Sequence, residues 1–453
     1  MTAVASSART HCLSPARDHP AVQAAGGPAR YARMFPELPA FEPEETFLHA
    51  IGRAGGPCDC DDDTDQAASL GEEAAGWPIF GQFVAHDITA DRSALQSHVN
   101  PATLRNARAP RLDLECLYGD GPVGHPFLFQ RGDPAKFLLG ADAGDVPRNA
   151  EGIAVIGDPR NDSHMLMAQI HLAMLKAHNA FVDDARDRGV PEPAVFATAA
   201  REMRWHYQWV LLDEFLPALV GRALVDEIAR EGPRWFRPGE DVFIPLEFAD
   251  AAFRYGHCQI RQKYQLHQDA EPVPIFPDLL GFRPVPPERW VDWTLFFDGS
   301  GAKTAQRAKK IDGRLPRSLI HLPVAITGEC EVDEYHSLAV RDLQRGRGVG
   351  LPSGEAVAQH LGLTPLSVEE VGLAAGGWTG PTPLWYYILR EAAVTTSGDR
   401  LGPVGGRIVA EVLMTLLNRD PTSVRFRSPD WTPRGVLVDL LTTRLRDAAA
   451  RRD

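Results

Sequence analysis

Apolar residues recur at helical spacing along most of this chain. Apolar side chains every three or four residues mark one buried face of a helix, and this pattern covers six segments: 165–182, 195–216, 218–230, 337–345, 354–361 and 405–418. In the second segment, Trp205, Trp209, Leu212 and Leu216 fall on one face. The alternation of apolar and polar residues that marks half-buried strands is scarce and short. The pattern therefore predicts a mainly α protein with few short strands.

Length and motif placement predict how the chain is divided. A chain of 453 residues corresponds to about three domains by length alone. Residues 1–45 are rich in Ala, Pro, Gly and Ser, which predicts an N-terminal extended arm. The candidate site residues described below are spread from position 82 to position 345 and must converge to act together. We therefore predict one large helical domain over residues 46–453.

Composition excludes several classes of partner. The formal net charge is −13 and the sequence pI is about 5.6, so the surface repels nucleic acid and anionic membranes. The first 30 residues lack a long apolar signal region, and no apolar run approaches the ~18 residues of a membrane helix. We expect a cytoplasmic protein without a membrane span. Six cysteines without CxxC pairing predict reduced thiols, and the sequence leaves the oligomeric state open.

A first candidate motif is Gly-Gln-Phe-Val-Ala-His-Asp at 81–87. Gln82 and His86 lie four residues apart, so on a helix they share one face and can point at the same small ligand. They form a polar pair in an otherwise apolar stretch. A polar pair in a buried helix is expected to be hydrogen-bonded or functional.

A second candidate motif is Phe-Arg-Tyr-Gly-His at 253–257. Arg254 precedes His257 by three residues, and Gly256 removes side-chain bulk beside the histidine. This layout suits an axial histidine ligand with a cation one turn away to meet a haem propionate. Taken singly, each buried histidine is more often a hydrogen-bonded core residue than a metal ligand.

Two further segments carry charged residues at the ends of predicted elements. Ile-Gly-Asp-Pro-Arg-Asn-Asp at 156–162 presents Arg160 just before the helical run that begins at Met165. Leu-Ala-Val-Arg-Asp-Leu-Gln-Arg at 338–345 carries Asp342 on a predicted helix that stops at the following glycines.

With these motifs in order, the sequence resembles the animal-type haem peroxidases, the peroxidase and cyclooxygenase superfamily, in what looks like a bacterial branch. The resemblance covers roughly residues 75–420 and is carried by the following matches: Gly81 to Asp87, Gly157 to Arg160, His171 with His178 and Asn179 on the next helix, Phe253 to His257, and Gln344 to Arg347 followed by Gly350 to Pro352. It implies a single large helical haem-peroxidase domain.

The resemblance implies a proximal role for four residues. His257 would bind the haem iron, and its other ring nitrogen would donate to Asp342, where the family commonly has Asn. An ionisable acceptor pushes the imidazole toward imidazolate and lowers the iron reduction potential. Arg254 and Arg345 would bind the cofactor as cations.

On the opposite face, the resemblance implies three catalytic residues. His86 would take a proton from hydrogen peroxide and return it to the departing oxygen. Arg160 would stabilise the charge that develops as the O–O bond splits. Gln82 would hold a water or small substrate beside the iron.

Departures from the family pattern bear on how cofactors are held. Ala85 and Ser163 stand where many members have the Asp and Glu that esterify haem methyl groups, and His164 follows where some have a sulfonium-forming Met. The haem would therefore be non-covalent haem b.

Calcium binding is left open by the sequence. Asp87 matches a calcium ligand of the family, and Asp113 and Glu115 align with the loop that supplies others. However, Ala109 replaces the hydroxyl residue that usually opens that loop.

The implied function is a haem-dependent peroxidase that reduces hydrogen peroxide through a ferryl intermediate and oxidises small aromatic or similar organic substrates. The alternative is an oxygenase or tailoring oxidase acting on a bound organic substrate, as the superfamily's fatty-acid oxygenases do. That chemistry needs a radical tyrosine, for which Tyr255, Tyr386 and Tyr387 are candidates. A haem sensor or storage protein is disfavoured because it gives no reason for the distal His, Gln and Arg.

Overall fold

The computed structural model describes residues 31–60, 69–90, 104, 106–140, 142–299, 303–330 and 332–444. Helices dominate, which confirms the mainly α prediction. The longer ones are α2 (Glu45–Gly52), α4 (Trp77–Ile88), α7 (Met165–Asp187), α8 (Glu192–Val210), α10 (Arg222–Glu231), α15 (Leu338–Gly348), α16 (Gly354–His360), α18 (Leu384–Thr396) and α19 (Pro403–Arg419). A π-helical turn, η4 (Leu211–Phe215), joins α8 to α9 (Leu216–Val220).

Short elements connect these helices. The short helices include α5 (Glu115–Tyr118), α6 (Gly121–Gly124), α11 (Leu246–Ala249), α12 (Gly256–Gln259), α13 (Arg317–Ile320), α14 (Val324–Thr327), α17 (Val368–Val371), α20 (Leu437–Leu441) and the 3-10 turns η3 (Pro159–Asp162) and η5 (Ala252–Arg254). The strands are β1 (Tyr31–Ala32), β2 (Asp59–Cys60), β3 (Leu70–Ala74), β4 (Ile244–Pro245), β5 (Lys263–Tyr264), β6 (Val273–Pro274), β7 (Arg307–Lys309) and β8 (Leu315–Pro316). They form two-stranded pairs: β1 with β4 and β2 with β8 in parallel, β3 with β7 and β5 with β6 antiparallel.

The predicted helices are found with small changes of boundary. The segments 165–182, 337–345, 354–361 and 405–418 fall within or one residue beyond α7, α15, α16 and α19. The predicted segment 195–216 continues through the π-helical turn into α9. Gly221, with φ of 85°, then ends α9 and opens α10, because this left-handed conformation suits glycine. The segment 218–230 is therefore divided at that residue.

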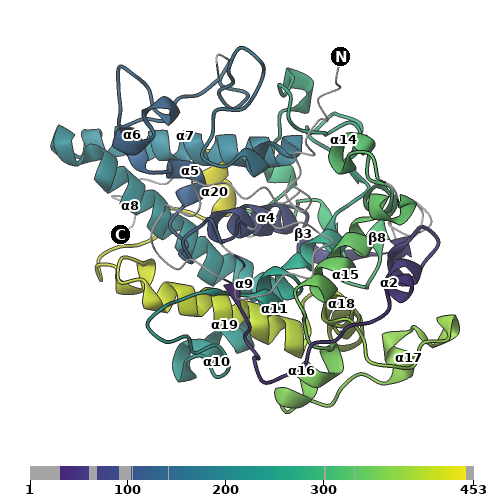
Figure 1. The fold of residues 1–453 in the computed structure, drawn as a ribbon. Helices are drawn as coiled ribbons and strands as arrows, with labels where there is room; N and C mark the ends of the chain where they lie inside the picture. The colour runs from purple at the N-terminus through teal and green to yellow at the C-terminus, as the bar shows by residue number, and fades with distance from the viewer. Residues whose placement is uncertain are drawn as a thin grey trace.

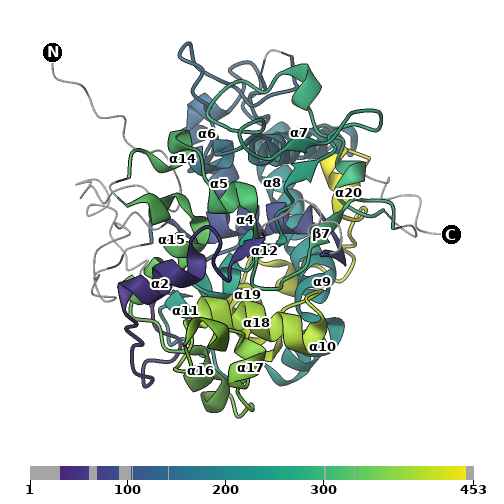
Figure 2. The ribbon, with the colours of Figure 1, turned by 90° about the vertical axis from the view of Figure 1, so that its right-hand side faces the viewer.

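Helix α4 lies at the centre of the molecule, with α7 on one side and α18 and α19 on the other in both views (Figures 1 and 2). Most of its side chains are buried, including Ile79, Phe80, Phe83 and Val84. Gly81 lets Phe215 approach closely, since a Cβ there would lie 3.3 Å from its Cζ. A helix that is apolar almost all round belongs in the core, and its few polar groups are thereby held in a fixed environment.

The described part of the N-terminal segment lies across this core. Tyr31 and Phe35 are buried, and Arg33 pairs with the buried Glu247 at 2.8 Å. Residues 1–30 of the predicted arm lie outside the described residues. Among the residues that the structure describes, no helix combines the length and the apolar character needed to cross a membrane.

Candidate functional site

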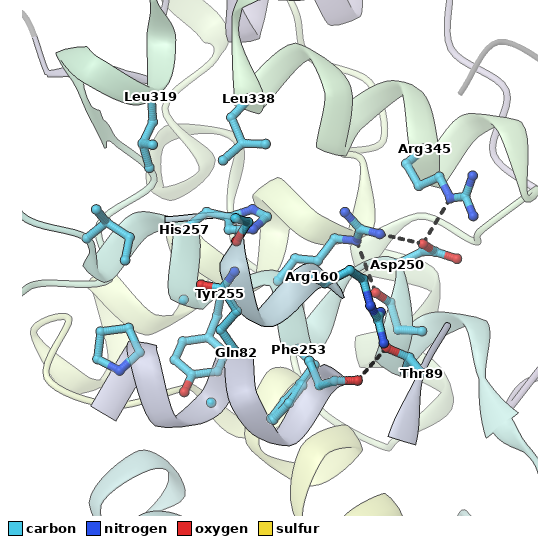
Figure 3. A pocket seen from close by; sticks show the side chains of 18 of the residues that line it. Gln82, Thr89, Arg160, Asp250, Phe253, Tyr255, His257, Leu319, Leu338 and Arg345 are labelled. Carbon is cyan, nitrogen blue, oxygen red and sulfur yellow. Dashed lines mark hydrogen bonds and ion pairs between the residues drawn. The ribbon is translucent and has the colours of Figure 1, made fainter. Parts of the chain in front are cut away.

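A cavity lined by residues of α4 and of the segment that leads into the short helix α12 is the site's central feature (Figure 3). Helix α4 contributes Pro78, Gly81, Gln82, Ala85 and Thr89 to its wall, and the facing segment contributes Phe253, Arg254, Tyr255, Gly256 and His257. Further polar lining comes from Tyr31, Arg160, Ser163, His164, Asp250 and Arg345, and apolar residues such as Ile260, Leu319 and Leu338 line the rest. The cavity therefore brings together Gln82, Arg160, Arg254, His257 and Arg345, which the sequence placed in one site.

His257 borders this cavity and is held from behind by Asp342. Its Nδ1 lies 2.6 Å from Asp342 Oδ2, and the Asp342 side chain is fully buried on α15. Ser337 caps the start of that helix by accepting from the Val340 N–H. Because Nδ1 carries the proton that is donated to the carboxylate, Nε2 carries the lone pair that can bind a metal. The pair has the arrangement of a metal-binding histidine oriented by a carboxylate.

Gly256 leaves room beside His257. A Cβ built on Gly256 would meet Pro78 Cβ at 3.8 Å and nothing nearer, and the residue borders the cavity. A larger side chain there would enter the space between α4 and α12. This open cradle, together with the oriented imidazole, fits a flat cofactor such as haem.

Guanidinium groups gather at one end of the cavity around Asp250. Arg254 Nη2 and Arg345 Nε lie 2.9 Å and 3.1 Å from the same carboxylate oxygen, as Figure 3 shows for Arg345. Arg254 Nη1 also lies 3.1 Å from Asp342 Oδ1. Arg254 is therefore shared between the carboxylate that orients His257 and the one that holds Arg345, and this end of the cavity suits an anionic group such as a propionate.

The opposite wall of the cavity carries Gln82 and Arg160. Gln82 Oε1 lies 2.9 Å from His164 Nε2, and Arg160 Nη2 donates to the backbone oxygen of His86 at 2.9 Å. Ala85 and Thr89 extend this wall along α4. This wall therefore presents hydrogen-bonding groups to the cavity, opposite His257.

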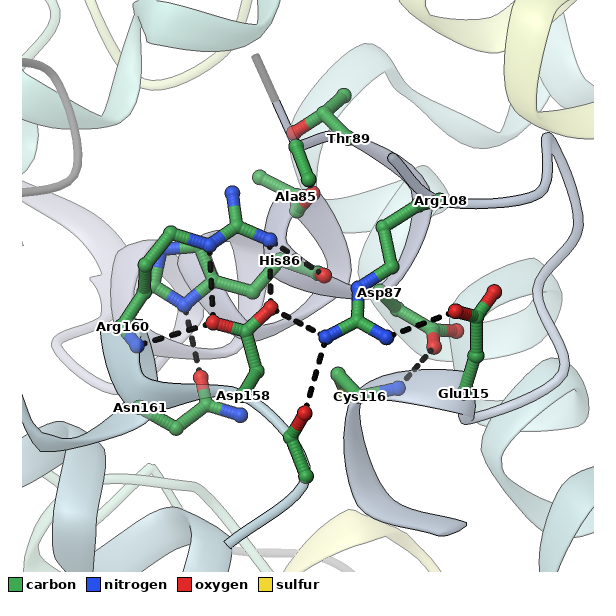
Figure 4. Close-up of polar contacts among 12 residues, drawn as sticks. Ala85, His86, Asp87, Thr89, Arg108, Glu115, Cys116, Asp158, Arg160 and Asn161 are labelled. Carbon is green, nitrogen blue, oxygen red and sulfur yellow. Dashed lines mark hydrogen bonds and ion pairs between the residues drawn. The ribbon is translucent and has the colours of Figure 1, made fainter. Parts of the chain in front are cut away.

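Arg160 is fixed by Asp158, as Figure 4 shows. Its Nε and Nη2 lie 3.0 Å and 2.7 Å from the two carboxylate oxygens, and Arg108 Nη2 lies 2.6 Å from the same group. Burial alone would raise the pKa of Asp158, but Arg160 and Arg108 hold it well below its ordinary value. The carboxylate thus stays ionised and keeps both guanidinium groups in place.

His86 is fully buried and does not belong to the cavity wall. Its Nδ1 lies 2.7 Å from Asn161 Oδ1, and Asn161 Nδ2 lies 3.0 Å from His171 Nδ1. Burial lowers the pKa of His171 to about 4, so His171 is a neutral acceptor at neutral pH. The Asn161 amide is therefore oriented by His171, and it accepts the Nδ1 proton of His86.

The carboxylates proposed as calcium ligands are engaged by other partners. Asp87 accepts from the backbone N–H of Leu114 at 3.1 Å and of Cys116 at 3.4 Å. Glu115 pairs with Arg108 at 2.9 Å (Figure 4). Burial, and then the charge of Asp113, raises the pKa of Asp87 to about 7. Within the described ranges, no group of three or more His, Cys, Asp or Glu side chains is arranged to hold a metal ion. Arg108 supplies positive charge at this loop by pairing with Glu115, so we expect no bound calcium ion there.

Chelation should therefore leave the protein's melting temperature unchanged. Arg108→Ala should instead lower it, because Glu115 and the buried Asp158 each lose a charged hydrogen bond, which contributes about 2 kcal/mol to stability. Thermal unfolding followed by circular dichroism with EGTA, and then with added calcium, measures both effects. A clear destabilisation by EGTA that calcium reverses would show that the carboxylates bind the ion after all.

Several residues of the site escaped the motif analysis. Asp250 lies four residues before Arg254 and Asn161 directly follows Arg160, but only folding brings Asp250 to Arg345 and Asn161 to His86. Asp158 lies inside the matched Gly-Asp-x-Arg motif, so its place next to Arg160 was a usable signal. Of the candidate tyrosines, Tyr255 borders the cavity, whereas Tyr387 accepts from the Leu366 N–H at 3.0 Å and Tyr386 donates to Val371 O at 3.5 Å.

The sequence is similar to that of a curated haem peroxidase. The chain is 25% identical to Heme peroxidase 2 of Caenorhabditis elegans in an alignment of 347 residues that covers 68% of this chain and 47% of that protein. The chain thus spans about half the length of this curated relative.

Solved structures share the fold over most of the chain. Peroxidase A of Dictyostelium discoideum matches with a TM-score of 0.63 and 15% identity, covering 92% of this chain and 89% of that one. The fatty acid alpha-dioxygenase of Oryza sativa matches with a TM-score of 0.61 and 14% identity, covering 91% and 78%. The family model described as animal haem peroxidase matches residues 102–371, more than half of the chain. The protein is therefore a member of the animal haem peroxidase family, an oxidoreductase family whose members bind haem.

Proposed function

We propose that this protein is a peroxidase that holds non-covalent haem b through His257, reduces hydrogen peroxide and oxidises small aromatic or similar organic substrates. Bound haem would supply the iron at which the O–O bond is split. It would also hold the oxidising equivalents until a substrate is oxidised. The observation that carries the proposal is one cavity that has the His257–Asp342 pair, at 2.6 Å, on one wall and Gln82 with Arg160 on the other.

On the proximal wall, Asp342 accepts from Nδ1 and so orients the His257 ring and strengthens it as an electron donor. Arg254 weakens this electron donation, because its guanidinium also donates a hydrogen bond to the Asp342 carboxylate. Arg345 and Arg254 would meet the cofactor's carboxylates at the cationic end of the cavity.

On the distal wall, Arg160 would stabilise negative charge that develops on peroxide oxygen. A preorganised donor of this kind contributes ~3 kcal/mol, and its pairing with Asp158 keeps it in place without rearrangement. Gln82 would bind the peroxide or a water through its amide.

His86 would serve as the proton acceptor and donor. Because Asn161 Oδ1 accepts the Nδ1 proton, the neutral ring carries its lone pair on Nε2, as a general base requires. The ring lies behind the wall formed by Arg160 and Gln82, so proton exchange with a ligand would run through a short movement of the ring or through a water.

An oxygenase acting on a bound organic substrate is the second candidate. Tyr255 favours it, since this tyrosine borders the cavity two residues before His257. Burial raises the pKa of Tyr255 far above its ordinary value, so the phenol stays protonated. That chemistry would use dioxygen rather than peroxide and would fail in Tyr255→Phe.

Turnover measurements separate the two candidates. Haem-loaded protein is mixed with phenols or with long-chain fatty acids, each with hydrogen peroxide or with dioxygen alone. The proposal expects oxidation of phenols that depends on peroxide and survives in Tyr255→Phe. Oxygenation of fatty acids with dioxygen alone, lost in Tyr255→Phe, would establish the oxygenase instead.

Acidified organic solvent should extract unmodified haem from the purified protein. Ala85 and Ser163 border the cavity where a carboxylate ester would have to form, and neither side chain can make that bond. Mass spectrometry of the extract and of the remaining polypeptide measures the attachment. Haem mass retained on the polypeptide would contradict non-covalent binding.

Asp342→Asn should raise the ferric/ferrous reduction potential, because a neutral acceptor takes less of the Nδ1 proton and leaves His257 a weaker donor. A rise of ~60 mV corresponds to a tenfold change in the one-electron equilibrium, and spectroelectrochemical titration measures it.

Asp250→Asn is the matched control for that variant. Asp250 also binds Arg254, whereas the Nδ1 of His257 donates to Asp342, so replacing Asp250 should change the potential much less. Equal shifts in both variants would mean that Asp342 acts through Arg254 rather than through His257.

A further inference from the structure

His164 borders the cavity on the same side as Gln82 and Arg160. It is 7% exposed, and its Nε2 lies 2.9 Å from Gln82 Oε1. In some members of the family the matching position is a Met that forms a sulfonium link to haem. An imidazole cannot form that link, so the family pattern does not explain His164.

The backbone of His164 is fixed on both sides, so the ring has a defined direction. Residue 164 forms a β-bridge with Leu280, and the Met165 N–H donates to Leu279 O at 2.8 Å. Gly281 permits this close approach, since a Cβ there would lie 1.9 Å from Asp162 O. A rigid backbone places the imidazole reproducibly beside Gln82.

The His164 ring does not cap helix α7. His164 occupies the N-cap position of α7, where Ser, Thr, Asp or Asn commonly accept from the first free N–H groups, but its side chain makes no capping hydrogen bond. Its position is therefore not explained by stability of the helix terminus, and its hydrogen bond to Gln82 ties it to the site.

The direction of this hydrogen bond decides what Gln82 offers to a ligand. An amide oxygen can only accept, so the bond requires a proton on His164 Nε2. With Oε1 held by His164, the amide turns its Nε2 hydrogens to the other side of the group. The distal wall then presents N–H donors from both Gln82 and Arg160.

We propose that His164 is a positioning residue that locks the Gln82 amide with its N–H groups toward the cavity. The inference rests on the proposed function, because it concerns the distal side of the same haem site. The locked amide and Arg160 together favour ligands that accept hydrogen bonds, such as a hydroperoxide anion, over ligands that donate them. Without His164 the amide could rotate and present its oxygen instead.

Carbon monoxide bound to the reduced, haem-loaded protein is a suitable probe, because its stretching frequency responds to nearby hydrogen-bond donors. His164→Leu and Gln82→Ala should each shift the band to higher wavenumber. The double variant should shift it no further, since both single changes remove the same donor. His164→Gln, which restores an N–H donor at similar reach, should keep the wild-type band.

Cyanide affinity of the ferric protein gives a second measurement. One lost hydrogen bond should weaken binding by about tenfold at most, equally in His164→Leu, Gln82→Ala and the double variant. His267→Leu is the control, because this half-buried ring contacts Glu288 O at 3.2 Å and does not line the cavity. Wild-type behaviour of His164→Leu beside an altered Gln82→Ala, or additive effects in the double variant, would overturn the inference.

Nitrogen NMR of the haem-free protein tests the same hydrogen bond without the cofactor. The signals of His164 are those that the wild-type protein shows and His164→Leu lacks. At alkaline pH they should be typical of a neutral imidazole ring protonated on Nε2. Protonation on Nδ1 would overturn the inference, because Gln82 would then donate to His164 and turn its oxygen toward the cavity. Failure of the wild-type protein to bind haem would refute the proposed function but leave this result standing.

Discussion

His257→Ala is expected to purify with little haem, or with haem of altered absorption spectrum. The substitution removes the imidazole that we propose as the iron ligand, while the cationic end around Asp250 remains for the propionates. Pyridine haemochrome analysis of the haem content per polypeptide, with the absorption spectrum of the reduced protein, measures the loss.

Two comparisons make this result specific to ligation. His267→Ala removes a histidine outside the cavity and should leave the haem content unchanged. Free imidazole added to His257→Ala should restore part of the wild-type spectrum, because Asp342 still offers an acceptor at 2.6 Å from the former Nδ1 position. Wild-type haem content and spectrum in His257→Ala would show that another residue binds the iron.

His86→Ala is expected to keep its haem but to react with hydrogen peroxide roughly 100-fold more slowly, or slower still, which is the contribution of a positioned acid–base group. The buried ring contacts Asn161 rather than the cavity wall, so its removal leaves the proximal side intact. Stopped-flow absorption after mixing with peroxide measures the rate.

Asn161→Leu tests how His86 is prepared for this role. Losing the acceptor for Nδ1 frees the ring to adopt the other tautomer, so the reaction should slow, but less than in His86→Ala. If His86→Ala lost its haem while His257→Ala reacted normally, the two faces would be assigned in reverse. A wild-type rate in His86→Ala would mean that the proton acceptor lies elsewhere.

The helices that could be predicted have polar residues at intervals among their apolar ones. Their burial is not one-sided, since residues 165–175 in α7, 338–345 in α15 and 408–417 in α19 are all buried. Helix α18 escaped prediction because the run from Leu384 to Leu389 is aliphatic and aromatic throughout, so no polar positions mark a helical period. A short apolar run of this kind has the same signature as a buried strand.

Contacts within one element, and the chemistry of single residues, were determined by the sequence alone. The four-residue spacing of Gln82 and His86 and the proximity of Arg254 to His257 follow from local geometry, and Ala85 and Ser163 exclude ester links whatever the fold. However, the four-residue spacing did not ensure that the side chains of Gln82 and His86 point to the same place. Gln82 lines the cavity, whereas the His86 ring turns to Asn161 because the η3 turn packs against α4 there.

Only the tertiary structure decided which distant charges meet. Asp342 lies 85 residues from His257, and Arg108 lies 50 residues from Asp158. Local propensity carries no information over such separations, because each pairing depends on how several buried helices pack. The same packing paired Glu115 with Arg108 and set His164 against Gln82, since a buried polar group takes the partner that the surrounding core brings within reach.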